Sequence, residues 1–374
     1  MSLIGIYSDV HISHNSSIMP TYNNDTDVYT TRLDMCKKSI EWAYSEFAKR
    51  KVDFVVNCGD MYDSHTISSD EMHTLVHSIE NIYKPYEALS WTPNLDITIP
   101  GNHDKFNNTF NSLEFLKLIG YTQLVDKYTY FNTMGLNIFN SWDCYAISFQ
   151  DAKDFVNIVY EMLNKYPRVN SKAVLFMHGD INGSMLSGGK RITDHIGTDF
   201  LTDHFDLIIN GHIHCHERIY NQNDKRIYNI GSLTSHSFAD SNNHIPACYI
   251  LNTETEEIEQ ISNPHAIVFK SYEIINDNDL NIMFNDITKS TNKIIVKIKC
   301  PIELKEKIEN IIKDMSQIIK SKFVFTYNKE ISNNFQTDEI EINIKNDIKD
   351  EFVTFLSGRQ DLKGNVDDYV SVIN

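Results

Sequence analysis

Side chains that can bind metal ions follow five short apolar runs of this sequence. A single Asp or His after a strand is usually a turn former, but turn chemistry explains five such groups in chain order poorly. Donors of the Asp, Asn and His types, without Cys, suit Mn²⁺, Fe²⁺, Mg²⁺ or Zn²⁺ better than a thiolate zinc site or an all-oxygen Ca²⁺ site. The candidates are Asp9, His11, Asp60, Asp63, Asn102, His103, Asp104, His178, His212 and His214.

The number of these donors indicates a pair of ions. They are too many for one tetrahedral ion and suit two ions that share a carboxylate. Two divalent ions about 3.5–4 Å apart can activate water and hold a phosphoryl group from both sides. The pattern therefore favours phosphoryl-transfer chemistry.

Such side chains meet only if the strands before them end at a common edge. Strands that alternate with helices of this length predict an α/β fold layered around a central sheet, whose carboxyl ends form a rim for ligands. Beyond residue 217 a run of strands without helices is expected, with a hairpin turn at Asn223-Asp224. The apolar runs that predict strands are 3–8, 52–57, 95–99, 173–177 and 205–210, and helical spacing predicts helices over 32–50, 68–89 and 151–165.

The pattern restarts after about residue 265, which predicts a second, small α+β domain over 270–345. Alternation predicts strands at 293–299 and 322–327, and Pro301 opens a predicted helix over 301–320. Residues 328–347 have the composition of a mobile loop. A final amphipathic helix and tail occupy 346–374, with Ile348, Phe352 and Phe355 on one face.

The charge is uneven along the chain. The net charge of −17 argues against a protein that coats nucleic acid. Between Lys289 and Lys329, however, ten lysines stand against four acidic residues. This basic segment is either a contact surface for a polyanion or a solvated, lysine-rich helix.

Composition also bounds the location of the protein. The N-terminus enters a strand pattern at once and has no basic leader, and no apolar stretch is long enough to span a membrane. Six scattered cysteines without a C-x-x-C pair indicate reduced thiols. We therefore expect a cytoplasmic protein; the Asn-, Ile- and Lys-rich composition is typical of an AT-rich genome, and a viral protein would act in the host cytoplasm.

The motifs D-x-H, G-D-x-x-D, G-N-H-D, a lone His after a strand and G-H-x-H, in this order, resemble the calcineurin-like metallophosphoesterase superfamily over residues 1–260. The resemblance implies a layered α/β/β/α sandwich and two ions, Mn²⁺ above others. It assigns His103 to the substrate phosphate, with Asp63 in support and Asp104 either orienting His103 or capping a turn. It assigns ion one to Asp9, His11, Asp60 and His214, and ion two to Asp60, Asn102, His178 and His212.

Within this superfamily the chain is similar to the SbcD-like DNA nucleases, and most of all to the phage recombination nucleases. The segments "RIYNIGSLTSHSF" and "HGDINGSMLSGG" carry this similarity. The resemblance implies a nuclease core over 1–265, a DNA-capping domain over 270–345, and a homodimer. It also implies an SMC-like ATPase partner in double-strand-break processing, with 346–374 as a docking segment. The lysines that would contact DNA are Lys293, Lys297, Lys299, Lys320 and Lys322.

Other functions remain open on the sequence. A metal-dependent phosphatase or small-molecule phosphodiesterase with an accessory domain would use the same ions, and the basic C-terminal domain is what argues for DNA. A non-catalytic scaffold would not need a phosphate-facing His103. Several further histidines are expected to be surface or supporting residues, namely His14, His65, His73, His77, His216 and His236.

Overall fold

The structure is a computed structural model that describes residues 2–14, 31–89, 91–107, 110–133, 141–186, 189–238, 244–289, 294–301, 308 and 323–329. Three of the predicted DNA-contacting lysines, Lys293, Lys320 and Lys322, lie outside the described residues, and so does the predicted segment 346–374. The same holds for most of the predicted helix over 301–320.

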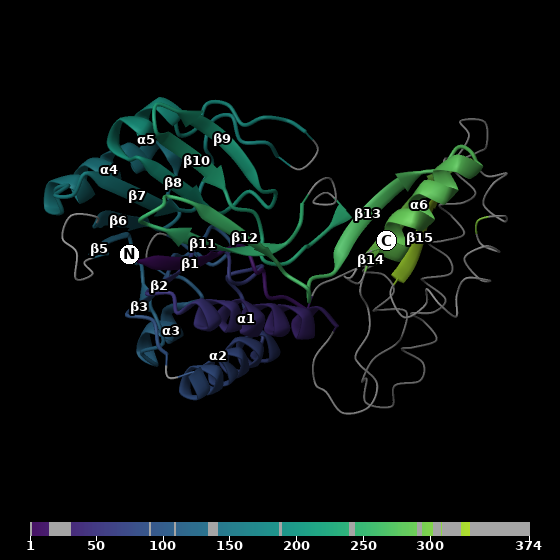
Figure 1. Ribbon diagram of the computed structural model, residues 1–374, viewed down its shortest axis with the longest axis horizontal. Coiled ribbons are helices and arrows are strands. Elements are labelled where there is room, and N and C mark those ends of the chain that lie inside the picture. The colour runs from purple at the N-terminus through teal and green to yellow at the C-terminus, as the bar shows by residue number, and fades with distance from the viewer. Residues whose placement is uncertain are drawn as a thin grey trace, which may run out of the picture.

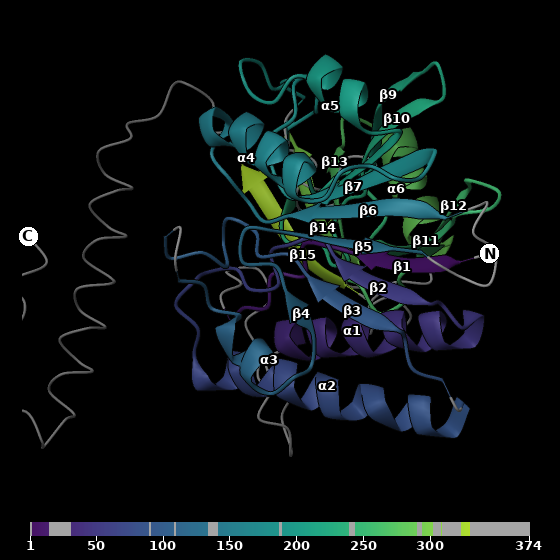
Figure 2. The same ribbon diagram turned by 90° about the vertical axis from the view of Figure 1, so that its left-hand side faces the viewer.

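The described residues form three sheets. The first has six strands: Leu3–Tyr7 (β1), Phe54–Asn57 (β2), Leu95–Thr98 (β3), Gln123–Leu124 (β4), Ala247–Asn252 (β11) and Ile258–Ser262 (β12). Their order is β12-β11-β1-β2-β3-β4. Strands β1 to β4 are parallel, whereas β11 runs antiparallel to β1, and β12 antiparallel to β11. The carboxyl ends of β1, β2 and β3 therefore meet at one edge. The helices Thr31–Arg50 (α1) and Ser69–Leu89 (α2) cover its outer face (Figures 1 and 2), and Glu114–Leu118 (α3) precedes β4.

The second sheet also has six strands: Tyr128–Asn132 (β5), Trp142–Ile147 (β6), Lys172–Met177 (β7), Leu207–Asn210 (β8), Glu217–Gln222 (β9) and Lys225–Asn229 (β10). Their order is β5-β6-β7-β8-β10-β9, with β6, β7, β8 and β10 parallel. The helices Ala152–Lys165 (α4) and Thr198–His204 (α5) lie on its outer face (Figure 2).

Side-chain alternation along the strands explains the layers. In β1, Ile4 and Ile6 point into a cluster shared by the two sheets, while Tyr7 packs in the cluster under α1 and α2. In β7, Phe176 enters the same intersheet cluster and Leu175 packs toward α4 and α5. The fold is thus the α/β/β/α sandwich that the resemblance implied, which confirms the predicted fold class. The expectation of one central sheet is wrong: the candidate ligands follow strands of two sheets, because each sheet buries one face against the other.

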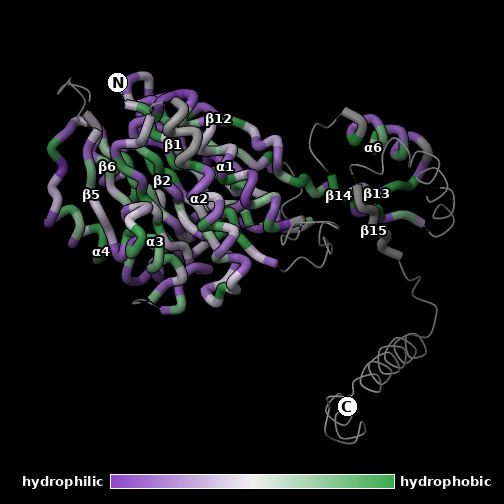
Figure 3. The backbone as a smooth tube through the Cα atoms, turned by 90° about the horizontal axis from the view of Figure 1, so that it is seen from below, coloured by the Kyte–Doolittle hydropathy of each residue, from purple (hydrophilic) through white to green (hydrophobic). Residues whose placement is uncertain are grey.

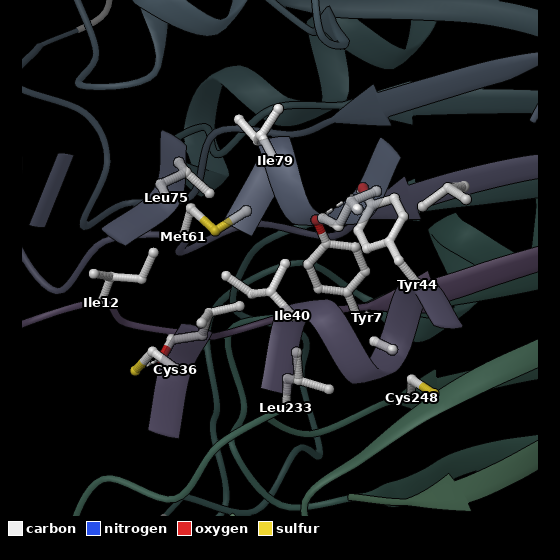
Figure 4. Packing of buried hydrophobic residues seen from close by; sticks show 14 of the residues in the cluster. Tyr7, Ile12, Cys36, Ile40, Tyr44, Met61, Leu75, Ile79, Leu233 and Cys248 are labelled. Carbon is white, nitrogen blue, oxygen red and sulfur yellow. Dashed lines mark hydrogen bonds between the residues drawn. The ribbon is translucent and has the colours of Figure 1, made fainter. Parts of the chain in front are cut away.

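The contact of α1 with the first sheet shows how the outer layer packs (Figure 4). Tyr44 of α1 lies edge-on to Tyr7 with ring centroids 5.8 Å apart, and their hydroxyls are 3.3 Å apart. Ile40 of the same helix faces Met61, and Leu75 and Ile79 of α2 close the cluster. Residues from both helices therefore fix the position of the loops that leave β1 and β2.

A third sheet lies beside this core (Figures 1 and 3). It is formed by Val268–Glu273 (β13), Ile294–Cys300 (β14) and Phe323–Lys329 (β15), which are parallel in the order β13-β14-β15. The helix Asp277–Lys289 (α6) packs on it through Leu280, Met283 and Ile287. Within the described ranges, no helix combines the length and the apolar character that a membrane crossing requires.

Candidate metal centre

The loops that follow β1, β2, β3, β7 and β8 bring seven predicted ligands together. Three overlapping groups of metal-type side chains form there, and the ligand atoms within each group lie within 4.8 Å of one another. These groups are His11, Asp60 and His103; Asp60, His178 and His212; and His11, His214 and His236. Asp60 belongs to two of the groups, as a carboxylate shared by two ions would.

The first half of the centre is built on the loop after β1. His11 Nε2 lies 3.7 Å from Asp9 Oδ1, 3.6 Å from Asp60 Oδ2 and 3.2 Å from His214 Nε2. His214 Nε2 is 3.9 Å from Asp9 Oδ1. These four side chains are the set predicted for ion one, and their nitrogen and oxygen atoms converge on one point.

The second half lies where the two sheets meet. Asn102 Oδ1 is 3.0 Å from His178 Nε2 and 2.9 Å from His212 Nδ1. His178 Nε2 is also 3.2 Å from Asp60 Oδ2. The other ring nitrogen of His178 donates to the carbonyl of Cys58 at 2.8 Å, which leaves Nε2 for the centre. These are the four residues predicted for ion two.

The backbone at four of these positions is in the left-handed region, which non-glycine residues seldom adopt. Asp9 has φ 52°, His11 φ 47°, Asp60 φ 50° and His212 φ 73°. Each such residue costs on the order of 1–2 kcal/mol, and such residues cluster at functional sites. The surrounding hydrogen bonds hold them, for example those from Asp9 N to Gly59 O and from His11 N to Asp60 O at 2.9 and 3.0 Å.

Two glycines allow the ligands to approach. A Cβ on Gly101 would stand 2.1 Å from Asp60 Oδ1, and one on Gly59 would stand 2.2 Å from His178 Nδ1. Gly59 also has φ 110°, which excludes other residues on conformational grounds. The backbone at Gly59 and Gly101 therefore packs closely against the predicted ligands, and the types of these ligands suit a pair of hard or borderline divalent ions.

Charge complementarity holds the buried cluster together. Burial by itself would raise the pKa of Asp60, but His178 and His11 hold the pKa of that carboxyl well below its usual range. Conversely, burial opposes the charge on His11, yet the carboxylates of Asp63, Asp9 and Asp60 raise its pKa to about 10. A divalent cation would take the place of these protons, since imidazoles bind metals only in the neutral form.

His103 borders the cluster and remains exposed, as a group that meets substrate must. Its Nδ1 donates to the backbone carbonyl of Asp63 at 2.7 Å, and the Asp63 carboxylate lies 3.1 Å from His11 Nδ1. Asp63 therefore supports both rings. The predicted orienting role of Asp104 is wrong: its buried carboxylate accepts N–H bonds from Gly101 and Tyr62, both at 2.9 Å. Asp104 therefore caps the turns after β2 and β3, which is the second role that the sequence allowed for it.

Three residues that the motifs did not identify contact the ligands. Asp180 Oδ1 lies 3.1 Å from His212 Nε2, so that it orients this ring as Asp63 orients His11. His236, expected to be only a supporting residue, packs with its ring centroid 4.4 Å from that of His11, and Arg32 lies behind it. The "HGD" segment was a local signal for Asp180, whereas no sequence signal marked Arg32.

The other predicted residues make different contacts. Lys297 and Lys299 are on β14, where Lys299 Nζ is 3.4 Å from Glu273 and Lys297 Nζ is 5.8 Å from the Phe238 ring. His73 and His77 pack ring to ring on α2. His216 bonds Tyr249 at 3.1 Å.

The comparison with a protein-family model agrees with this geometry. The sequence profile described as calcineurin-like phosphoesterase matches residues 2–216. Among solved structures, a dimetal phosphatase from Danio rerio is similar with a TM-score of 0.40 and 12% identity, over 70% of this chain and 99% of that one. No curated protein sequence matches the chain.

Proposed function

Because this chain belongs to the calcineurin-like phosphoesterase family, we propose that it is a two-metal phosphodiesterase whose substrate is DNA. The observation that carries the two-metal part is the position of Asp60. Its Oδ2 lies 3.6 Å from His11 Nε2 on one side and 3.2 Å from His178 Nε2 on the other. A single carboxylate between two donor sets is what a pair of closely spaced ions requires.

The ions, for which we propose Mn²⁺, supply an activated water and positive charge for the phosphoryl group. Asp9, His11, Asp60 and His214 would hold one ion, and Asp60, Asn102, His178 and His212 the other. His103 acts on the substrate. Its Nδ1 proton is engaged by the carbonyl of Asp63. The proton for the leaving oxygen would therefore come from Nε2 of the ring in its doubly protonated form.

The position of the third sheet, next to the edge of the core that carries the metal centre, supports a polymeric substrate. Strand β12 runs antiparallel to β11, which runs antiparallel to β1, so β12 and β1 end at the same edge of the sheet. The chain therefore leaves the core at the metal edge and enters β13 only six residues later. Phe269 of β13 packs on Phe238 with ring centroids 5.2 Å apart. Phe238 follows His236, which lies beside the predicted ligand His11, by two residues.

The two faces of β14 differ in a way that favours a polyanion. Ile294, Val296 and Ile298 alternate into the small cluster with α6. The opposite face carries Ile295, which packs in the cluster of the core, and next to it Lys297 and Lys299. The two lysines thus lie on the face of β14 that is turned toward the core. Cations here would contact the phosphates of a strand entering the centre.

Exposed aromatic side chains that follow His103 in the sequence add to this support. Phe106 and Phe110 are 68% and 63% exposed, and the Phe106 ring lies 5.1 Å from that of His65. Phe106 follows His103 by three residues, at most about 11 Å along the chain. That reach equals about three stacked nucleotides at 3.4 Å each. Exposed rings at this distance can stack on bases of the substrate strand.

The partners of the protein belong to the same proposal. We extend it to a homodimer and to an SMC-like ATPase that delivers DNA ends, on the basis of the SbcD-like sequence features, with action in the cytoplasm during recombination or repair. Co-purification with a co-expressed ATPase subunit, tested with and without residues 346–374, would examine this extension.

The substrate is tested by comparing turnover on four substrates with Mn²⁺. These are linear duplex DNA, single-stranded DNA, bis-p-nitrophenyl phosphate and p-nitrophenyl phosphate. We expect cleavage of DNA and of the diester, with negligible hydrolysis of the monoester. Efficient monoester hydrolysis without DNA cleavage would instead establish a phosphatase.

Two lysine variants test whether the third sheet binds DNA. Lys297→Ala should raise KM for DNA about fivefold and lower the salt slope of binding by about one, with no effect on the small diester. The matched control is Lys270→Ala, because Lys270 pairs with Asp286 of α6 at 2.6 Å on the other face. Equal effects of the two variants on DNA would contradict the proposed interface.

A further inference from the structure

The carbonyl groups of the Asp9–His11 segment accept hydrogen bonds from side chains that are distant in sequence. His236 Nε2 is 3.3 Å from Asp9 O, Thr234 Oγ1 donates to Val10 O at 2.8 Å, and Arg32 Nη2 donates to His11 O at 3.0 Å. The N–H groups on the other side of the segment bond to the loop after β2. The segment that carries two predicted ligands is therefore fixed on both sides.

Arg32 is the centre of this arrangement. It is the second residue of α1 and is 3% exposed. Its Nη1 donates to Ser235 O at 3.2 Å, and its Nη2 approaches His236 Nδ1 at 2.5 Å as well as His11 O. One guanidinium thus ties the loop after β1 to the 233–236 segment. A planar group with several donors can do this, whereas an ammonium group cannot.

These contacts also fix the chemical state of His236. A guanidinium only donates hydrogen bonds, so Nδ1 of His236 must be the acceptor and carry no proton. In a neutral ring the proton is then on Nε2, which faces the carbonyl of Asp9. Both ring nitrogens are engaged. His236 therefore has no lone pair to offer an ion, although its ring centroid lies 4.7 Å from that of His214.

We propose that Arg32 and His236 form a clamp that positions Asp9 and His11 for ion one, and that His236 is not itself a ligand. The proposal rests on the two-metal centre of the proposed function but not on DNA as its substrate. Without the clamp, Asp9 and His11 would leave their left-handed conformations for more favourable ones. The ion that they hold would then bind more weakly, while the ion held by Asn102, His178 and His212 would not.

The test is a Mn²⁺ titration of the full-length protein, followed by electron paramagnetic resonance, on three variants. Arg32→Lys keeps the charge but cannot reach Ser235 O, His11 O and His236 together. His236→Ala removes the ring, and His236→Gln restores an N–H donor near the position of Nε2. We expect Arg32→Lys and His236→Ala to weaken one of the two ions 10- to 100-fold, and His236→Gln to recover part of that loss.

Arg50→Lys is the matched control, because Arg50 ends the same helix and bonds Glu46 and Glu259 at the surface. It should bind both ions as the wild type does. Wild-type affinity for both ions in Arg32→Lys and His236→Ala would overturn the clamp.

The absorption of Co²⁺ bound at saturation distinguishes the clamp from direct ligation. A clamp predicts the same band intensity in His236→Ala as in the wild type. A change that indicates loss of a nitrogen ligand would show that His236 binds the ion, and would refute the proposal. A wild-type protein that binds a single ion would instead refute the two-metal centre, and one that binds two ions without cutting DNA would refute only the substrate.

Discussion

A methyl group at residue 101 should disable the centre without changing any ligand. The Cβ of Gly101→Ala would stand 2.1 Å from Asp60 Oδ1 and 2.5 Å from Asp60 N, whereas ordinary contacts begin at 3.4 Å. Relief requires a displacement of about 1.3 Å of the carboxylate that both ions share. A misplacement of about 1 Å can cost about 100-fold in rate, and overpacking costs about 1–3 kcal/mol of stability. We therefore expect at least about 100-fold lower turnover of a phosphodiester and weaker binding of both ions.

The assay is Mn²⁺-dependent hydrolysis of bis-p-nitrophenyl phosphate, with metal content and melting temperature measured on the same preparations. Gly197→Ala is the control, since a Cβ there meets nothing within 4 Å. That control should retain turnover and lose less than about 1 kcal/mol, because Gly197 is the N-cap of α5. Wild-type turnover and metal affinity in Gly101→Ala would refute the close fit between this loop and Asp60.

Three further predictions concern the proton donor His103, the stability of the fold and the pH dependence of that stability. His103→Ala should keep both ions and lose about 100-fold or more in kcat; full turnover with bound metal would remove its assigned role. Asp143→Ala should destabilise the fold by about 3 kcal/mol in urea unfolding, because the carboxylate accepts N–H bonds from Val169 and Asn170 at 2.8 and 2.7 Å, and a loss below about 1 kcal/mol would contradict this. Burial raises the pKa of Asp96 to about 7. The folded state therefore retains a proton that the unfolded state releases near pH 4, and the free energy of unfolding falls as the pH rises from about 4 to 7. Asp96→Asn should remove this fall, which amounts to about 4 kcal/mol over the three pH units, and an unchanged pH profile would show that Asp96 does not titrate in this range.

The sequence predicted the strands that carry the ligands because their apolar runs are mostly buried. The Asn223-Asp224 hairpin was predictable for a local reason: both residues have positive φ, as a tight two-residue turn requires. The strand β6 was not predicted, although all six of its residues are buried. Its sequence, "WDCYAI", includes Asp143, which strand propensity disfavours and which is retained by its hydrogen bonds to the 169–170 loop.

Sheet membership could not be predicted from periodicity. Alternation identifies a strand but does not determine its neighbours, so strands of two sheets were assigned to one. The same limit explains why the contacts of the residues around the ligands were not predicted. Arg32 and His236 are 204 positions apart, and their contact depends on how α1 packs against the 233–236 segment. Asp104 could have oriented His103 or capped a turn, and the folded loop decided for the cap because three buried N–H groups face it.

The central claim is that two divalent ions share Asp60. Crystals grown with Mn²⁺ and measured at the manganese absorption edge test it most directly. Two anomalous peaks about 3.5–4 Å apart are predicted, with the Asp60 carboxylate between them and His11 and His178 on opposite sides. A single peak, or a pair of peaks that Asp60 does not bridge, would contradict the account.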